Sequence, residues 1–189
     1  MKYILDCHCK GVHSFVLNEN NGYLTRAYYA DSNHELWQEN KIAIHGHKFD
    51  LKMTVIFGEL INISYEKSPS GEEFGEYIYQ SKILCFDGWF QKIGIQNLMQ
   101  INGQVLAKMQ SLELKNNDLH TVYIPKNQKC LWVIQESEPS FGVENKHYSK
   151  LNLDLWEPKG LYNEGTKSDM VKYLGLHLKE IQKVTTIEN

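Results

Sequence analysis

Two histidines separated by a single residue are the feature of this sequence with the most direct chemical use. His45 and His47 lie in the segment Ile42–His47, whose composition predicts a β-strand. Side chains two positions apart on a strand point to the same face, so both imidazoles are expected to meet in one small volume. A neutral imidazole can remove a proton near physiological pH, and it can also bind a metal ion. Both uses are open at this pair.

Lys52 follows His45 by seven residues and opens the next predicted strand, Met53–Phe57. A bend between the two strands would bring its amine toward the imidazoles. An ammonium group in a water-poor pocket stabilises the negative charge that forms on a ketone oxygen when the neighbouring carbon loses a proton. The other interpretation of Lys52 is a solvated lysine at the edge of a strand. Tyr148 is a further candidate, as the acid.

A metal site is the alternative use of the histidine pair. His45, His47 and Cys130 would offer two imidazoles and a thiolate, a ligand set that suits zinc or iron. Cys7, His8 and Cys9 are adjacent in the sequence, but they do not form a CxxC motif. On a strand, the two thiols would point away from the imidazole between them. We therefore expect unpaired strand cysteines there rather than metal ligands.

The rest of the chain predicts the elements that must position these groups. Short β-favouring segments alternate with turns such as Asn18–Gly22 and Ser68–Gly71, which is typical of a sandwich or barrel. Residues 87–105, rich in Gly, Gln and Asn, predict a long loop with room for a short helix. From Ser168 to Val184, apolar residues recur at helical spacing, which predicts a C-terminal helix with Ser168 as its N-cap. The predicted strands are 11–17, 23–30, 42–47, 53–57, 60–65, 76–86, 106–114, 121–124 and 129–135.

Residues 42–70 resemble the dTDP-4-dehydrorhamnose 3,5-epimerase family of the cupin superfamily. The matching positions follow in that family's order and at its spacing: His45, Lys52, the Gly58-Glu59 turn and Ser68-Pro69. Pro125–Cys130 resembles the second cupin motif, with Cys130 at the position of its histidine, and Gly22–Tyr28 more weakly resembles another strand. The resemblance spans roughly residues 19–140. It implies a mainly β fold, a cupin-type double-stranded β-helix (jelly-roll) barrel.

By the same resemblance, the protein would be a nucleotide-sugar epimerase or ketoisomerase that removes a proton beside the ketone of a 4-keto sugar, with no metal or organic cofactor. The expected catalytic residues are His45, His47, Lys52 and Tyr148. The expected substrate-binding residues are Arg26, Tyr28, Cys130 and Trp132. Arg26 would bind a phosphate group, and the alternative for it is a surface salt bridge. Two alternatives stay open: a metal-dependent cupin enzyme, either a dioxygenase or an isomerase, and a cupin that binds a small ligand without turnover.

The length and charge of the chain limit its organisation and partners. Its 189 residues fit one domain, which we expect to consist of a barrel over residues 1–160 and a helical appendage over 161–189. The net charge of −3, without a Lys/Arg cluster, argues against nucleic acid or an anionic membrane as a partner. We expect a cytoplasmic protein, because no secretory signal is seen at the N-terminus. We also expect, by resemblance, a homodimer formed through an open edge strand near the N-terminus.

Overall fold

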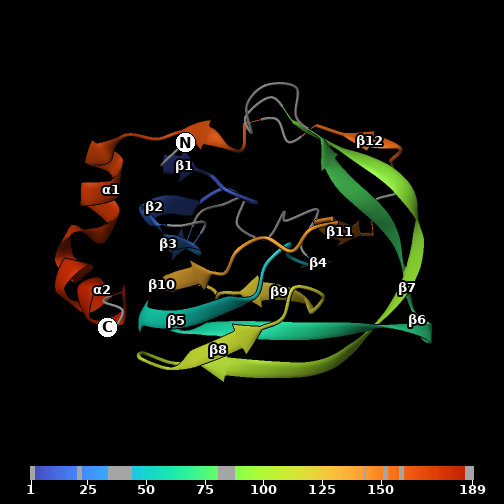
Figure 1. The fold of residues 1–189 in the computed structure, drawn as a ribbon, viewed down its shortest axis with the longest axis horizontal. Helices are drawn as coiled ribbons and strands as arrows, with labels where there is room; N and C mark the ends of the chain where they lie inside the picture. The colour runs from blue at the N-terminus through green and yellow to red at the C-terminus, as the bar shows by residue number, and fades with distance from the viewer. Residues whose placement is uncertain are drawn as a thin grey trace.

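A computed structural model describes residues 3–20, 23–33, 44–80, 88–142, 144–150, 153–157 and 160–185, which form two antiparallel sheets and a C-terminal helical segment (Figure 1). The first sheet has seven strands in the order β13-β1-β2-β3-β10-β5-β8. They are β1 (Tyr3–Leu5), β2 (Val12–Asn20), β3 (Tyr23–Asp31), β5 (Leu51–Phe57), β8 (Ser111–Leu114), β10 (Lys129–Glu136) and β13 (Asn163–Glu164). The second sheet has six strands in the order β11-β4-β9-β6-β7-β12. They are β4 (Ile44–His45), β6 (Leu60–Gln80), β7 (Trp89–Leu106), β9 (Leu119–Tyr123), β11 (Lys146–Ser149) and β12 (Leu155–Trp156).

The mainly β, jelly-roll-like fold with a C-terminal helix that the sequence predicts is confirmed. The two sheets are hydrogen-bonded as separate sheets rather than as one closed barrel. Met53, Val55 and Trp132 of the first sheet and Leu60 and Leu106 of the second pack together in one core between them. Among the helices that the structure describes, none is long and apolar enough to cross a membrane.

Strands β5 and β10 lie inside the first sheet, and β10 is buried on both faces. Alternation along β10 sends Cys130 and Trp132 toward the second sheet, and Leu131 and Val133 toward the C-terminal helices. Burial on both faces explains why this strand is an almost continuous apolar run in the sequence. The inner face of β10, together with that of β5, forms part of the floor on which a site between the sheets can be built.

The C-terminal segment consists of α1 (Lys167–Leu174), a 3₁₀ turn (Gly175–His177) and α2 (Leu178–Thr185), and it lies along the outer side of the first sheet (Figure 1). Its N-cap is Thr166 and not the predicted Ser168. The Thr166 hydroxyl accepts the N–H of Asp169 at 3.2 Å, and the Asp169 carboxylate accepts the N–H of Thr166 at 2.9 Å. This capping box fixes the start of the helix two residues earlier than expected.

Two predictions along the hairpin of β6 and β7 are wrong. The Ser68–Gly71 segment is not a turn but part of β6, whose register against β7 shifts between Lys67 and Glu72 and so absorbs the extra residues. The predicted loop at 87–105 is strand β7 from Trp89 onward, and it pairs with β6 along its length. Pairing with β6 stabilises an extended chain that the Gly-, Gln- and Asn-rich sequence does not favour by itself.

Candidate metal centre

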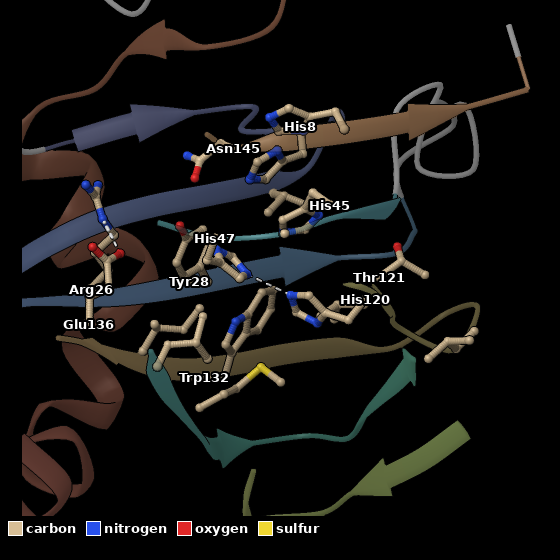
Figure 2. A pocket seen from close by; sticks show the side chains of 18 of the residues that line it. His8, Arg26, Tyr28, His45, His47, His120, Thr121, Trp132, Glu136 and Asn145 are labelled. Atoms are coloured by element: carbon tan, nitrogen blue, oxygen red, sulfur yellow. Dashed lines mark hydrogen bonds and ion pairs between the residues drawn. The ribbon is translucent and has the colours of Figure 1, made fainter. Parts of the chain in front are cut away.

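Three neighbouring strands of the second sheet each contribute one histidine at the same level. In the strand register, His147 of β11 lies opposite His45 of β4, and His45 lies opposite His120 of β9. Residues directly opposite each other in a sheet project from the same face. His47 follows two residues after His45, and Figure 2 shows it beside His45 and His120. Four imidazoles therefore gather on the inner face of this sheet.

His45, His47 and His120 are close enough together to bind one metal ion. One ring nitrogen from each lies within 4.8 Å of the others, and the Nε2 atoms of His47 and His120 are 2.9 Å apart. Two nitrogens that bind one ion at right angles, each at about 2.1 Å, are about 3.0 Å from each other. The spacing therefore fits imidazole coordination of the kind that suits zinc, iron, copper or nickel.

Asn62 of β6 orients one of these three histidines. Its side chain is buried, and its Oδ1 lies 2.6 Å from Nδ1 of His120. The amide nitrogen of Asn62 donates to Ser64 Oγ at 3.2 Å, so the amide oxygen is the atom that faces the ring. An amide oxygen can only accept, which places the proton of His120 on Nδ1 and leaves the lone pair on Nε2. Hydrogen bonds of this kind fix the tautomer and the ring plane of metal-binding histidines.

Burial favours the neutral form of three of the clustered imidazoles. It lowers the pKa of His47, His120 and His147, and the charge that His45 would carry lowers each of them further. His8 stacks on His45, with the two ring centroids 5.7 Å apart. The pKa of His8 is lowered to about 3, mainly by burial and to a smaller extent by the charge that His45 would carry. A neutral imidazole has a free lone pair, which is the form that metal binding requires.

The histidines open onto a cavity of about 620 Å³ between the two sheets. Apolar side chains supply much of its wall, among them Val12, Phe49, Leu51, Met53, Val122 and Ile134. At one end, Nε of Arg26 lies 3.0 Å from Oε1 of Glu136 (Figure 2). Burial raises the pKa of Glu136, and the arginine opposes that effect. The cavity thus combines a cluster of nitrogen ligands, apolar walls and one polar end.

The structure brings part of the predicted binding set into this cavity. Arg26, Tyr28 and Trp132 line it, and the rings of Tyr28 and Trp132 stack with centroids 5.4 Å apart. Cys130 does not line it. Its side chain has no exposed surface in the apolar core, and burial raises the pKa of its thiol to about 12. The third position of the metal set, predicted to be Cys130, is taken by His120.

Two residues predicted to be catalytic lie outside the cavity. Lys52 is exposed, because its neighbours Leu51 and Met53 point inward and successive residues of β5 alternate in direction. Tyr148 is buried, but it follows His147 on β11 and so faces the other side of the sheet, where its hydroxyl donates to Glu76 at 3.0 Å. The predicted meeting of two imidazoles is found, and the predicted approach of the Lys52 amine is not.

The predicted site did not include His120, His147, His8 or Asn62. His120 comes soon after a turn, a position more typical of surface residues, yet it is the second residue of β9 and points inward. Asn62 carries a weak signal, since it is a polar residue at an inward-facing position of a strand. His8 is held by a loop rather than a strand, so the alternation argument applied to Cys7-His8-Cys9 does not hold there.

Comparisons with known proteins find similarity in fold. No family model matches the sequence, and the search of curated proteins gives no significant match. Among solved structures, the chain is similar to a hydroxypropylphosphonic acid epoxidase from S. wedmorenis, with a TM-score of 0.45 and 9% identity over 71% of this chain and 54% of that one. It thus spans about half the length of that enzyme.

Two further solved structures are described as cupins. An RmlC-like cupin from Shewanella frigidimarina has a TM-score of 0.42 and 14% identity over 74% of this chain and 85% of that one. A cupin-like protein from Thermotoga maritima has a TM-score of 0.41 and 9% identity over 86% and 84%. These likenesses are in fold alone, and they do not bear on the resemblance to the dTDP-sugar epimerases.

Proposed function

We propose that this protein is a metal-dependent enzyme in which His45, His47 and His120 bind one divalent transition-metal ion. The observation that carries the proposal is the approach of one ring nitrogen from each histidine to within 4.8 Å of the others. The hydrogen bond from His120 to Asn62 supports it, because it turns the His120 lone pair toward the other two rings. Burial lowers the pKa of His47 and His120 and so favours their neutral, metal-binding form, which supports it as well.

The open side of the histidine group favours catalysis over a purely structural metal. Three protein ligands leave coordination positions free, which is the arrangement of catalytic sites. A divalent ion would supply Lewis acidity and, if it is iron, redox chemistry. The apolar and aromatic walls of the cavity favour a small, largely apolar organic substrate, with the Arg26–Glu136 pair as its polar contact. The proposal covers the dioxygenase and isomerase classes of metal-dependent cupin.

The epimerase hypothesis has less support from the positions of its residues. It requires an acid and a cation beside the histidine base, and Lys52 and Tyr148 lie outside the cavity. Arg26 forms an ion pair with Glu136, so its charge is already balanced before any phosphate arrives. We therefore prefer the metal-dependent function.

Metal analysis tests the proposal. Protein purified without chelators, or reloaded with Fe(II), Co(II) or Zn(II), is expected to retain about one ion per chain. The variants His47→Ala and His120→Ala should lose most of this metal, because each removes a ligand. The matched control is His177→Ala, which removes a histidine from the 3₁₀ turn far from the group.

Three results would reject the proposal. The first is that the wild-type protein retains no transition metal. The second is that the His120→Ala and His177→Ala variants have equal metal content. The third is that metal-free protein still turns over its substrate. A protein that binds small molecules in the cavity without metal would instead be the non-catalytic cupin of the alternative hypothesis. Ligand-induced shifts in melting temperature would identify that case.

A further inference from the structure

The loop that carries His8 has an unusual backbone. Five non-glycine residues in the described part of the chain have a positive φ, and three of them lie close together around His8: Asp6 at 55°, His8 itself at 69° and Tyr162 at 54°. The N–H of Tyr162 donates to the carbonyl of Asp6 at 3.0 Å, which joins the two chain segments. A left-handed backbone is unfavourable for residues with a Cβ, and it persists only where the surroundings hold it.

The Asp6 carboxylate holds this corner together. It accepts the N–H of Gly11 at 2.9 Å, pairs with Nζ of Lys10 at 2.9 Å, and accepts from Nδ2 of Asn163 at 3.3 Å. These contacts close the loop without using the His8 imidazole. The fold therefore maintains a strained backbone whose visible result is the placement of the His8 side chain in the cavity.

The His8 ring lies just beyond the three metal-binding nitrogens. It stacks on His45 at 16° between ring planes, and Figure 2 shows it beside His45 on the side away from His120. Its Nδ1 lies 3.2 Å from the hydroxyl of Tyr162. When that hydroxyl donates, the neutral ring carries its own proton on Nε2. Within the described residues, Nε2 makes no hydrogen bond, so it is available to a molecule in the cavity.

We propose that His8 is a further residue of the active site, one that donates a hydrogen bond from Nε2 to a small anionic or oxygen-bearing ligand held at the metal. Tyr162 is the positioning residue that fixes the proton of His8 on that nitrogen. This inference rests on the proposed metal centre, and it adds to it a recognition group outside the ligand set. The ligand class is a small anion or a carboxylate, enolate or hydroxyl oxygen able to accept one hydrogen bond.

Azide binding to the cobalt-loaded protein tests this role. Azide is a small anion that takes an open metal position, and the visible spectrum of Co(II) reports its binding without any substrate. The variant His8→Phe keeps an aromatic ring against His45 but lacks the donor. We expect it to bind as much cobalt as the wild type and to bind azide about tenfold more weakly, the size of one hydrogen bond to a charged group. Tyr162→Phe should weaken azide binding in the same direction.

A matched control is His177→Phe, which changes a histidine that stacks on Phe57 outside the cavity and should leave azide affinity unchanged. If the wild type takes up no cobalt, the proposed metal centre itself fails. If cobalt binds and His8→Phe binds azide as tightly as the wild type, only the role of His8 fails. A loss of cobalt in His8→Phe would also overturn the inference, since it would make His8 a requirement for the metal rather than for its ligand.

Discussion

At the scale of the residue, Asn62 orients His120 through the contact between its Oδ1 and Nδ1 of the ring. Replacement by leucine keeps a side chain of similar volume but leaves the Nδ1–H of His120 without its acceptor at 2.6 Å. The ring is then free to change tautomer and to turn its protonated nitrogen toward the metal. Loss of such a partner typically lowers metal affinity 10- to 100-fold, so we predict a loss of roughly that size for Asn62→Leu. Competition with a chromophoric chelator measures it.

The control for this prediction is Asn62→Asp, which keeps an oxygen acceptor at the same place. It should retain more of the affinity than the leucine variant. Equal metal affinities in the wild type and Asn62→Leu would contradict the proposed orientation of His120. Urea unfolding of the two variants separates a loss of metal affinity from a loss of the fold.

Cys130 and Cys9 should be inert as thiols in the folded protein. Burial is the main cause that raises the pKa of each to about 12, so the reactive thiolate is scarce at neutral pH. Cys130 has no exposed surface, and Cys9, at the cavity wall, is only 5% exposed. We predict that iodoacetamide at pH 8 labels neither residue in native protein and labels both in urea. Peptide mass mapping reads the sites. Rapid labelling of native Cys130 would show that the core opens or that the thiol is activated.

At the scale of the element, β5 shows how strand alternation separates two neighbouring residues. Lys52 is exposed and Met53 is fully buried. We predict that Lys52→Ala changes the free energy of unfolding by less than about 0.5 kcal/mol, as for most surface substitutions, and leaves metal binding intact. Met53→Ala should cost about 2–5 kcal/mol, because it leaves a cavity in the core. Urea unfolding measures both values, and a large loss in Lys52→Ala would restore a role for that amine.

Alternation and burial on both faces are also what made part of the fold predictable. The run Lys129–Gln135 predicts β10, and the spacing of His45 and His47 predicts that they share a face. Both patterns depend on neighbours in sequence. Strand β7 cannot be predicted from neighbours in sequence. Its Gly, Gln and Asn residues are typical of a loop, and they form a strand because they pair with β6 over a long stretch. The N-cap was placed at Ser168, where Thr166 offers the better-spaced partner for Asp169.

Only the part of the site that comes from one short chain segment could be predicted from the sequence. His45 and His47 lie two residues apart, so their convergence follows from the geometry of one chain segment. His120 and His147 lie 75 and 102 positions from His45 (120 − 45 and 147 − 45), and they meet it only because three strands pair in one register. Register between distant strands is set by the whole sheet. Cys130 was chosen as the third ligand because it matches the position of a histidine in the second cupin motif. It is buried in the core and therefore does not reach the site.

At the scale of the whole molecule, the edges of the sheets decide how copies of the chain can meet. The first sheet ends at β8 and β13, which are four and two residues long. The N-terminal strand β1 is paired on both sides, by β2 and β13, so the open edge is not at the N-terminus as predicted. On the second sheet, β12 covers β7 only at Phe90 and Gln91, and in the described part of the chain no strand pairs with the rest of that edge.

This uncovered part of β7 lacks the usual protection of an edge strand. From Ile93 to Val105 the sequence has no charged residue and no proline, and four side chains, Ile93, Ile95, Ile101 and Val105, are 44% to 57% exposed. Charges and prolines on edge strands normally prevent pairing with other chains. An antiparallel pairing of two copies centred on Leu98 would set Ile95 of one chain opposite Ile101 of the other, so the edge is complementary to itself.

We therefore predict a homodimer that joins the second sheets of two copies through β7. Light scattering over a range of concentrations should give the mass of a dimer for the wild type. The double variant Ile95→Lys with Ile101→Lys should be a monomer, because like charges would face each other across the two-fold axis. Leu176→Lys is the control, since it changes a residue that is 94% exposed in the 3₁₀ turn and should leave the dimer intact. A wild type that stays monomeric at all concentrations, or a dimer that survives the β7 charges, would show that this edge is not the contact, and the exposed isoleucines would then need another explanation.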